Sequence, residues 1–444
     1  MLSIYTSEIT PRLQYISEFI GKELFDKPCT ITTDKQTFLN SNNFKINYSN
    51  EVFSNDTYHI APVSLLFQNN ITEHAPDVFN FENNKALYKS EGDFPFDIFA
   101  ASFYLITRYE EYLDHEEDEY GRYAHINSLA YREGFLELPL INIWLVSFKD
   151  SLQSKYPGLL FKRLQFSCNI TYDIDIAYSF LYKGISRTIA GFVRSLLKGN
   201  WREIDDRWLV LTGKKQDPFD CFEWLDALHL YCRIKPYYFF LVAKKQEGYD
   251  KNISTDVKQF RELIEYYASK YEVGLHPSWK SGDNPGLLKE ELEWLEVVTD
   301  KPVISSRQHY IRFKTPETFR TLINAGLKHE FSMGYGSING FRASVCSSYK
   351  WYDLQHEKPT ELVISPFCFM DANSYYEQKQ TPEQTYMELV KYYELVKKLN
   401  GNFIPIWHNH ILGSDPQFKG WKEMFEVFMK ETVYWDAYSD MTVV

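Results

Sequence analysis

The hydrophobic pattern of the first 150 residues differs from that of the rest of the chain. Short apolar runs such as residues 58–63 alternate with turns, and residues 96–113 have the apolar spacing of a helix. The acidic stretch that follows, residues 114–119, is interpreted as a solvated loop, with a cation site as the alternative. Lys155-Tyr156-Pro157-Gly158 predicts a boundary. We therefore expect an N-terminal α/β domain over residues 1–158 and a second domain over residues 159–444.

Beyond that boundary, strand-like apolar runs alternate with helical patterns. The predicted strands cover residues 164–170, 236–243, 271–275, 303–305, 361–366 and 402–407. The strongest helical pattern covers residues 381–400, where Thr381 and Gln384 suit a capping box, Pro382 suits the first turn and Gly401 suits the exit. Strands that alternate with helices predict an α/β fold with parallel strands.

Polar side chains follow several of these strands directly. They are Asp173 and Asp175 after the first strand, His276, Arg307 with His309, and His408 after the last. Functional residues at the carboxyl ends of successive strands are typical of a (β/α) barrel. An open doubly wound sheet would carry a glycine-rich phosphate loop after its first strand, and none is present. We expect a distorted (β/α) barrel preceded by a smaller α/β domain.

Composition and charge narrow the function classes. The 444 residues carry 48 Lys or Arg and 60 Asp or Glu, and this net charge of −12 argues against general nucleic-acid binding. No apolar run reaches the roughly 18 residues that a transmembrane helix needs, and the first residues lack the pattern of a signal peptide. The six cysteines are dispersed, which fits free thiols in a reducing compartment. We expect a cytoplasmic protein without a transmembrane segment or a nucleic-acid partner.

The pair Asp173 and Asp175 is the first candidate for chemistry. Side chains alternate along a strand, so the two carboxylates point the same way if the chain stays extended. Like charges so placed are costly unless a cation or an Arg lies between them, or one is protonated. The pair permits water activation by a metal ion together with a carboxylate base. A loop pair that caps the next helix is an equally good interpretation.

The other strand-end residues each have a functional and a structural interpretation. A neutral imidazole at His276 suits Zn²⁺, and a satisfied structural histidine is the alternative. Arg307 could hold a catalytic carboxylate ionised through bidentate hydrogen bonds, or form an ordinary salt bridge. His408 is a candidate acid or base, or a loop residue bonded to backbone.

A basic helical segment forms a further candidate. Lys183, Arg187, Arg194 and Lys198 are interleaved with Leu, Ile and Phe. An ordinary helix of the barrel is the favoured interpretation, and contact with a membrane surface is the alternative.

The residues around Asp173 resemble a known family. Thr171-Tyr172-Asp173-Ile174-Asp175 is similar to the first motif of the polysaccharide deacetylase superfamily, which is NodB-like and of the carbohydrate esterase 4 type. In that family the first Asp is the general base and the second is a metal ligand. The resemblance extends to three further positions. His276 matches the ligand His of the second motif, Arg307 matches the Arg that orients the base, and His408 matches the late His that protonates the leaving group.

Nearly the whole chain resembles bacterial deacetylase-like proteins that carry an N-terminal domain of unknown function. The segments that carry this likeness are residues 94–97, 108–112, 121–122, 249–252, 332–335, 340–343 and 351–354. One departure concerns the second motif, His-x-x-x-His in the family, because Lys280 stands where its second His is expected. His309, beside Arg307, is the candidate to replace that ligand. The Pro-x-Gly end of the family's Arg motif is also missing.

The resemblance implies a metal-dependent deacetylase, an amide hydrolase acting on an N-acetylated sugar or glycan precursor. It implies Asp175, His276 and His309 as ligands of a divalent metal, with zinc expected, and Asp173, His408 and Arg307 as catalytic residues. Arg342, Asp353 and Tyr310 are the candidate substrate-binding residues; Arg342 and Asp353 could equally be structural ion-pair members. Two alternatives remain. The first, which Lys280 favours, is a non-catalytic relative that binds a glycan or nucleotide sugar. The second is a hydrolase of a small non-sugar amide.

Overall fold

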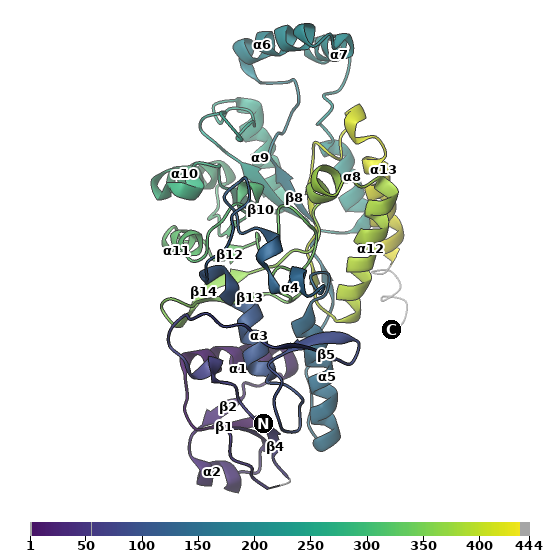
Figure 1. Cartoon of the computed structure of the whole chain (residues 1–444). Helices are drawn as coiled ribbons and strands as arrows, with labels where there is room; N and C mark the ends of the chain where they lie inside the picture. The colour runs from purple at the N-terminus through teal and green to yellow at the C-terminus, as the bar shows by residue number, and fades with distance from the viewer. Residues whose placement is uncertain (1, 55, 436–444) are drawn as a thin grey trace.

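The computed structural model describes residues 2–54 and 56–435, and the chain folds into two parts that lie one below the other in Figure 1. The N-terminal part carries a four-stranded parallel sheet of order β2-β1-β3-β4. Its strands are β1 (Leu2–Thr6), β2 (Thr30–Thr32), β3 (Phe44–Tyr48) and β4 (Tyr58–Ile60), with the antiparallel pair β5 (Val78–Phe81) and β6 (Asn84–Leu87). Its helices are α1 (Pro11–Leu24), α2 (Lys35–Asn40), α3 (Ile98–Ile106), α4 (Leu129–Arg132) and α5 (Leu140–Lys155), with the short turns η1 (Ser64–Phe67), η2 (Tyr109–Tyr112) and η3 (His125–Asn127).

The helix predicted over residues 96–113 is interrupted. It begins after Asp97, whose side chain accepts a hydrogen bond from the backbone of Ala100, and all nine residues of α3 are buried. The chain then breaks at Arg108, which adopts the left-handed conformation with φ 54°, before η2 begins. The buried guanidinium of Arg108 pairs with Glu110 and Glu111, and these tertiary contacts override the helical pattern.

The C-terminal part contains an eight-stranded sheet of order β13-β14-β12-β11-β10-β9-β8-β16, parallel except for the pairing of β13 with β14. Its strands are β8 (Thr171–Ile174), β9 (Tyr237–Leu241), β10 (Glu272–His276), β11 (Ser305–Ser306), β12 (His329–Glu330), β13 (Tyr349–Asp353), β14 (Lys358–Ile364) and β16 (Ile406–His408). A small parallel pair joins β7 (Ser167–Cys168) to β15 (Asn402–Phe403).

Helices of the C-terminal part alternate with these strands. They are α6 (Gly184–Leu197), α7 (Trp201–Leu211), α8 (Phe222–Cys232), α9 (Lys258–Lys270), α10 (Pro285–Thr299), α11 (Glu317–Asn324), α12 (Pro382–Lys398) and α13 (Trp421–Val427), with the short turns η4 (Ser281–Asp283), η5 (His309–Ile311), η6 (Asn373–Glu377), η7 (Pro416–Phe418) and η8 (Phe428–Tyr434). The predicted α/β fold with a parallel sheet is confirmed. Among the described residues no helix is both long and apolar enough to cross a bilayer.

The strand order given above is that of an open row, and closure into a barrel stays a prediction. One parallel bridge joins Met370, beyond β14, to Ile406 at the start of β16. The backbone of Ile406 also donates a hydrogen bond to the carbonyl of Phe369. The segment after β14 therefore lies alongside β16, at the opposite end of the row of strands.

The predicted helix over residues 381–400 is confirmed as α12. Thr381 and Gln384 form the expected capping box, and Pro382 stands in the first turn. The helix leaves through Asn400, which takes the left-handed conformation with φ 53°. Gly401 is needed for a different reason, because a Cβ there would lie 2.4 Å from the sulfur of Cys346.

The pair α6 and α7 is not a helix layer of the sheet. The two helices form a hairpin at the extreme top of Figure 1, away from the strands, and Ser195 is the one buried residue of α6. The favoured expectation of an ordinary barrel helix for residues 183–198 is therefore wrong. The apolar residues of α6 are therefore left exposed instead of packing on the sheet.

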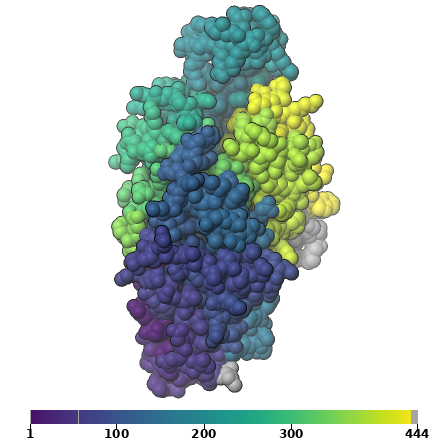
Figure 2. Space-filling model, viewed as in Figure 1, coloured from purple at the N-terminus to yellow at the C-terminus, as the bar shows by residue number. Residues whose placement is uncertain are grey.

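The two parts share one hydrophobic core. Buried apolar residues of α1, α3 and α5 belong to the same contiguous cluster as those of β8, β9 and β14. At the boundary the ring of Tyr352 lies 4.9 Å from Tyr15 and 5.3 Å from Phe103. Figure 2 shows the blue end of the N-terminal part rising between the green and yellow elements of the C-terminal part. This contact brings N-terminal residues to the carboxyl ends of the strands.

Candidate active site

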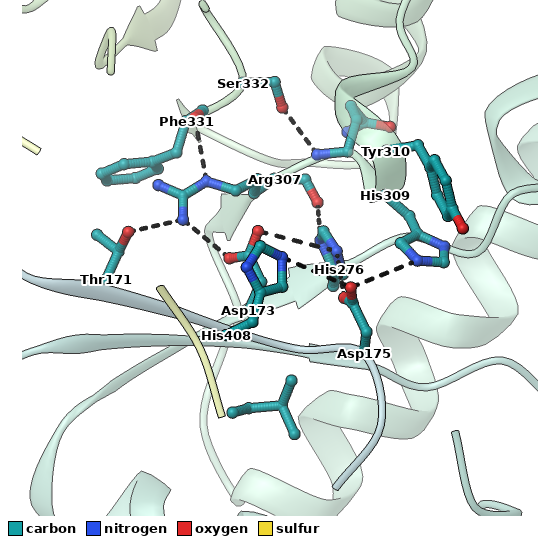
Figure 3. A network of polar contacts seen from close by, with 12 residues as sticks. Thr171, Asp173, Asp175, His276, Arg307, His309, Tyr310, Phe331, Ser332 and His408 are labelled. Atoms are coloured by element: carbon teal, nitrogen blue, oxygen red, sulfur yellow. Dashed lines mark hydrogen bonds and ion pairs between the residues drawn. The ribbon is translucent and has the colours of Figure 1, made fainter. Parts of the chain in front are cut away.

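The register of the parallel strands gathers the predicted residues at one edge of the sheet. Asp173 of β8 is paired with His408 of β16, and His276 ends β10 beside Leu241 of β9. Asp175 follows β8, and Arg307 and His309 follow β11. Figure 3 shows the carboxylates of Asp173 and Asp175 with the three imidazoles around them.

Asp173 is held by a buried arginine. Nη1 of Arg307 donates to Oδ1 of Asp173 at 2.8 Å and to the hydroxyl of Thr171 at 2.7 Å, and Nε donates to the carbonyl of Phe331 at 3.1 Å. Both Arg307 and Asp173 are almost fully buried. The guanidinium of Arg307 pairs with the buried carboxylate of Asp173 at Oδ1, which leaves Oδ2 outside this contact.

Asp175 lies at the centre of three imidazoles. Its Oδ1 is 3.0 Å from Nε2 of His276, and its Oδ2 is 3.8 Å from Nε2 of His309 and 3.6 Å from Nε2 of His408. Burial alone would raise the pKa of Asp175, but the three imidazoles outweigh it and hold this pKa well below its usual range.

His276 directs one nitrogen at Asp175. Its Nδ1 lies 2.5 Å from the carbonyl oxygen of Arg307, which only accepts, so Nδ1 carries the proton. Burial lowers the pKa of His276, whereas Asp173 and Asp175 raise it and prevail. A metal ion must therefore displace the proton at Nε2, so metal binding at this nitrogen competes with protonation.

His309 is oriented in the same way by a residue from another loop. Its Nδ1 donates to Oδ1 of Asp250 at 3.0 Å, which leaves Nε2 to face Asp175. A carboxylate behind a ligating histidine fixes its tautomer and raises its basicity. Asp250 also accepts a hydrogen bond from the backbone of Trp279, so its position is itself fixed.

The three side chains fit a divalent cation. The ligand atoms of Asp175, His276 and His309 all lie within 4.8 Å of one another. Oδ1 of Asp175 is buried, and Nε2 of His276, 3.0 Å away, is a neighbour that would have to give up its proton to a bound ion. Two imidazole nitrogens and one carboxylate oxygen form a donor set that zinc and similar ions accept.

His408 is paired with a second carboxylate. Its Nδ1 donates to Oδ1 of Asp371 at 2.6 Å, and its backbone N–H donates to Oδ2 of the same residue at 2.8 Å. Burial would lower the pKa of His408, but Asp371 first and Asp175 next raise it to about 9. His408 is therefore an imidazolium at neutral pH, with the Nε2 proton facing the cavity.

These residues open into a cavity of about 390 Å³. Its floor contains Asp173, Asp175 and the three histidines, and its walls include residues of both parts of the chain. Tyr120 and Arg122 come from the N-terminal part, where Asp118 accepts hydrogen bonds from the backbone and the side chain of Arg122. A pocket of this size accommodates a small ring-shaped ligand.

One wall of the cavity is aromatic. Tyr249 stacks against Trp279 at a centroid distance of 4.1 Å, and Tyr310 lies 5.0 Å from Tyr249. Tyr120 joins them from the N-terminal part, 5.3 Å from Tyr310. Such a wall offers flat apolar faces with hydroxyl groups at their edges, which suits the faces and hydroxyls of a sugar.

The structure places the remaining predicted residues in three different ways. Tyr310 lines the cavity. Arg342 is buried away from it, where Nε and Nη2 donate to the two oxygens of Glu111 at 2.7 and 2.8 Å. Asp353 is also buried outside the cavity and accepts two hydrogen bonds of 2.8 Å from Arg320. We therefore leave Arg342 and Asp353 out of the proposed substrate contacts.

Lys280 lies at the surface rather than among the candidate ligands. Its ammonium group pairs with the carboxylate of Glu247, and 62% of its side chain is exposed. Of the described residues, His309 and not Lys280 completes the cluster with Asp175 and His276.

Sequence reasoning gave no role to four residues that shape the site. Asp250 and Asp371 orient His309 and His408, and Tyr120 and Arg122 follow directly on residues 114–119, the segment predicted as a solvated loop. The position of Asp371 beyond a predicted strand was a usable signal. No local pattern links residue 120 to a site almost 200 residues further along the chain.

Comparisons with known proteins give the following. A protein family of unknown function, DUF7033, matches residues 2–157. No curated protein matches the chain. Among similar solved structures is a protein assigned as a polysaccharide deacetylase from Mycobacterium smegmatis, with 13% identity and a TM-score of 0.39, where the match covers 61% of this chain and 85% of that one. A polysaccharide deacetylase from Bacillus cereus has 11% identity and a TM-score of 0.30, with 60% of this chain and 88% of that one covered. A probable polysaccharide deacetylase from Pseudomonas aeruginosa has 9% identity and a TM-score of 0.39, with 60% of this chain and 85% of that one covered.

Proposed function

We propose that the chain is a metal-dependent amide hydrolase that removes an acetyl group from an N-acetylated sugar or glycan precursor. The observation that carries this proposal is that two groups with partners of opposite charge line one cavity. Asp173 is paired with the guanidinium of Arg307, while His408 is paired with the carboxylate of Asp371, which raises the pKa of the imidazole to about 9. One group that accepts a proton and one that donates it are what hydrolysis of an amide requires.

Asp175, His276 and His309 would hold the divalent cation, for which zinc is the first candidate. When bound, the ion would act as a Lewis acid on the acyl carbonyl and lower the pKa of water beside it. Asp250 keeps His309 turned toward the site, and the carbonyl of Arg307 does the same for His276. The protein therefore presents the three donors without rearrangement of their immediate neighbours.

Asp173 and His408 would move the protons. Oδ1 of Asp173 is occupied by Arg307, so Oδ2 takes the proton from the attacking water. The water oxygen forms a bond to the acyl carbon, and the bond from that carbon to nitrogen breaks. Nε2 of His408 gives its proton to the departing nitrogen, which leaves as an amine while the acyl group leaves as acetate. Arg307 and Asp371 are positioning residues, because each acts through the group it contacts.

Tyr310, Tyr249 and Tyr120 would bind the sugar. The cavity of about 390 Å³ suits a single sugar residue, and the aromatic wall faces the proton-transfer groups. The same volume would admit a small non-sugar amide, which remains the second candidate on this observation. Lys280 was the feature that favoured a non-catalytic binding protein, and its surface position removes that support.

We also propose that the strands close into a distorted barrel and that the two domains meet at residue 158. The bridge between Met370 and Ile406 supports the first, and the end of α5 at Lys155 supports the second. Cys29, Cys221, Cys232, Cys346 and Cys368 are free thiols, which supports a reducing compartment such as the cytoplasm.

The test is acetate release from a panel of N-acetylated sugars by the metal-loaded protein. We expect Asp173→Asn to lower kcat by about 10²- to 10⁴-fold, because it removes the proton acceptor, and to leave the fold intact. Asp353→Asn is the matched control, since Asp353 is equally buried and paired with an arginine but lies outside the cavity. Per folded molecule, Asp353→Asn should keep its activity. Undiminished turnover by Asp173→Asn would contradict the proposed mechanism.

A further inference from the structure

The helical hairpin α6–α7 exposes an unusual amount of apolar surface. On α6 the exposed apolar residues recur at intervals of three and four, which places them on one face: Ile185, Ile189, Val193, Leu196 and Leu197. Ile185 and Leu197 are 81% and 82% exposed, near the two ends of the helix. Large apolar side chains grouped on one helix face are rare on a surface that meets only water.

The second helix adds two indole rings. Trp201 and Trp208 are 68% and 58% exposed and stand seven residues apart, on the same face of α7. Tryptophan favours the boundary between apolar and aqueous phases, because its ring is largely apolar and its N–H seeks a polar partner.

The hairpin is basic, although the protein is acidic. Residues 183–215 carry eight Lys or Arg and three Asp or Glu, a net charge of +5, whereas the whole chain has a net charge of −12. Arg194 and Lys198 border the apolar face of α6 on one side, where they line a groove together with Leu197, and within the described part of the chain neither forms an ion pair. These cations are therefore available to an anionic partner.

Contacts within the molecule fix the conformation of the hairpin. Its two helices are locked together by the guanidinium of Arg207, which lies 4.5 Å from the ring of Phe180 and so close to Gly191 that a Cβ there would be 2.6 Å from Nη1. The approach to α6 is fixed by Asp217, whose carboxylate accepts hydrogen bonds from the backbone of residues 179–181.

The base of the hairpin adjoins the candidate site. Nη2 of Arg187 donates to the carbonyl of Lys251, which is itself a lining residue of the cavity. Gly184, where α6 starts, is nine positions after Asp175, a span of at most about 30 Å even when fully extended. The first turn of α6 is therefore tied to the wall of the cavity.

We propose that the α6–α7 hairpin docks the protein on the surface of an anionic lipid bilayer. The apolar face and the two indoles enter the headgroup region, and the basic residues contact the lipid phosphates. A second copy of the chain fits less well, because two hairpins of net charge +5 placed face to face would repel each other. This inference does not depend on the proposed catalytic activity.

The experiment is co-sedimentation of the full chain with phosphatidylcholine vesicles that contain or lack phosphatidylglycerol. We expect binding to the anionic vesicles, and much less to the neutral ones. The pair Arg194→Glu and Lys198→Glu should weaken binding by about tenfold or more, since each cation near an anionic surface contributes measurably. The pair Ile189→Asp and Leu197→Asp should do the same by removing the inserted apolar groups. All four positions are exposed, so circular dichroism should show an unchanged fold.

The matched control is Leu230→Asp on α8, because Leu230 is 81% exposed but lies outside the hairpin. It should bind vesicles as the wild type does. Quenching of tryptophan fluorescence by brominated lipid should fall in the double variant Trp201→Phe and Trp208→Phe. Failure of the wild type to bind anionic vesicles, or equal binding by the Ile189→Asp and Leu197→Asp pair, would overturn the proposal. A lipid-independent dimer that those two substitutions dissolve would assign the face to a second copy instead.

Discussion

Nη1 of Arg122 donates a 2.7 Å hydrogen bond to the backbone carbonyl of Tyr310, and this contact joins the N-terminal part to the wall of the cavity. Tyr310 adopts the left-handed conformation with φ 60°, which few residues with a side chain take without support from their neighbours. Gly336 makes room for the contact, since a Cβ there would lie 2.0 Å from Nη1 of Arg122 and 2.9 Å from the carbonyl of Tyr310. The N-terminal part thus helps to hold a residue of the candidate site.

Arg122→Ala should raise KM more than it lowers kcat. Loss of the guanidinium frees Tyr310 and Tyr120, the proposed substrate contacts, but leaves Asp173 and His408 in place. A loss of about 10- to 100-fold in kcat/KM is expected from misplacement of binding groups. Steady-state kinetics with the best substrate of the panel measures the split. Lys314→Ala is the control, because it removes only an exposed ion pair to Glu117 in the same N-terminal segment. A loss confined to kcat would contradict the assigned role.

Asp371→Asn should move the alkaline limb of the kcat profile to lower pH. His408 is the proposed proton donor, and Asp371 is the chief cause of its raised pKa of about 9. Activity that needs the imidazolium is present below this pKa and is lost as the pH rises through it, so removing the carboxylate brings the loss to lower pH. A metal ion bound beside Asp175 would move the alkaline limb to lower pH by the same amount in the wild type and in Asp371→Asn.

The contrasting variant for this profile is Asp250→Asn. Asp250 contacts His309 and not His408, so its removal should weaken metal binding without shifting the alkaline limb at saturating metal. Equal pH shifts in the two variants would show that the limb does not report His408.

Metal content should depend on His309 and not on Lys280. Elemental analysis should find about one divalent ion per chain in the wild type and in Lys280→Ala, with loss of the ion in Asp175→Ala, His276→Ala and His309→Ala. Binding should weaken as the pH falls, because the pKa of His276 is raised and its proton must be displaced. Full metal content in His309→Ala would remove this residue from the ligand set.

Glu111→Gln should lower the free energy of unfolding by about 3–5 kcal/mol, because it leaves Arg108 and Arg342 buried without their shared partner. Burial would raise the pKa of Glu111, but Arg342 and Arg108 lower it to about 2. Its stabilising contribution is therefore complete above its unfolded pKa of about 4.3 and is lost as the pH falls toward 2.

Urea unfolding at pH 7 and at lower pH measures this difference. The wild type should approach the variant in stability as the pH falls, whereas a gap that persists undiminished down to pH 2 would contradict the assignment. Glu137→Gln, which breaks an exposed pair with Lys391, is the control and should change stability by less than about 1 kcal/mol.

The sequence by itself determined the alternation of strands and helices and the set of residues at the strand ends. Asp173, Asp175, His276 and His408 could be grouped in advance because parallel strands place their carboxyl ends at one edge of a sheet. The capping box of α12 was equally readable, since it depends on residues only three apart. These features are local, and periodicity and spacing report local features well.

Only the tertiary structure decided which partner each side chain meets. It placed Asp250 behind His309, Asp371 behind His408, and Arg342 and Asp353 in buried ion pairs outside the cavity. It also turned α6 and α7 away from the sheet and brought Tyr120 to the aromatic wall. Such contacts join residues far apart in the chain, and they are selected by the packing of the whole core rather than by any spacing in the sequence.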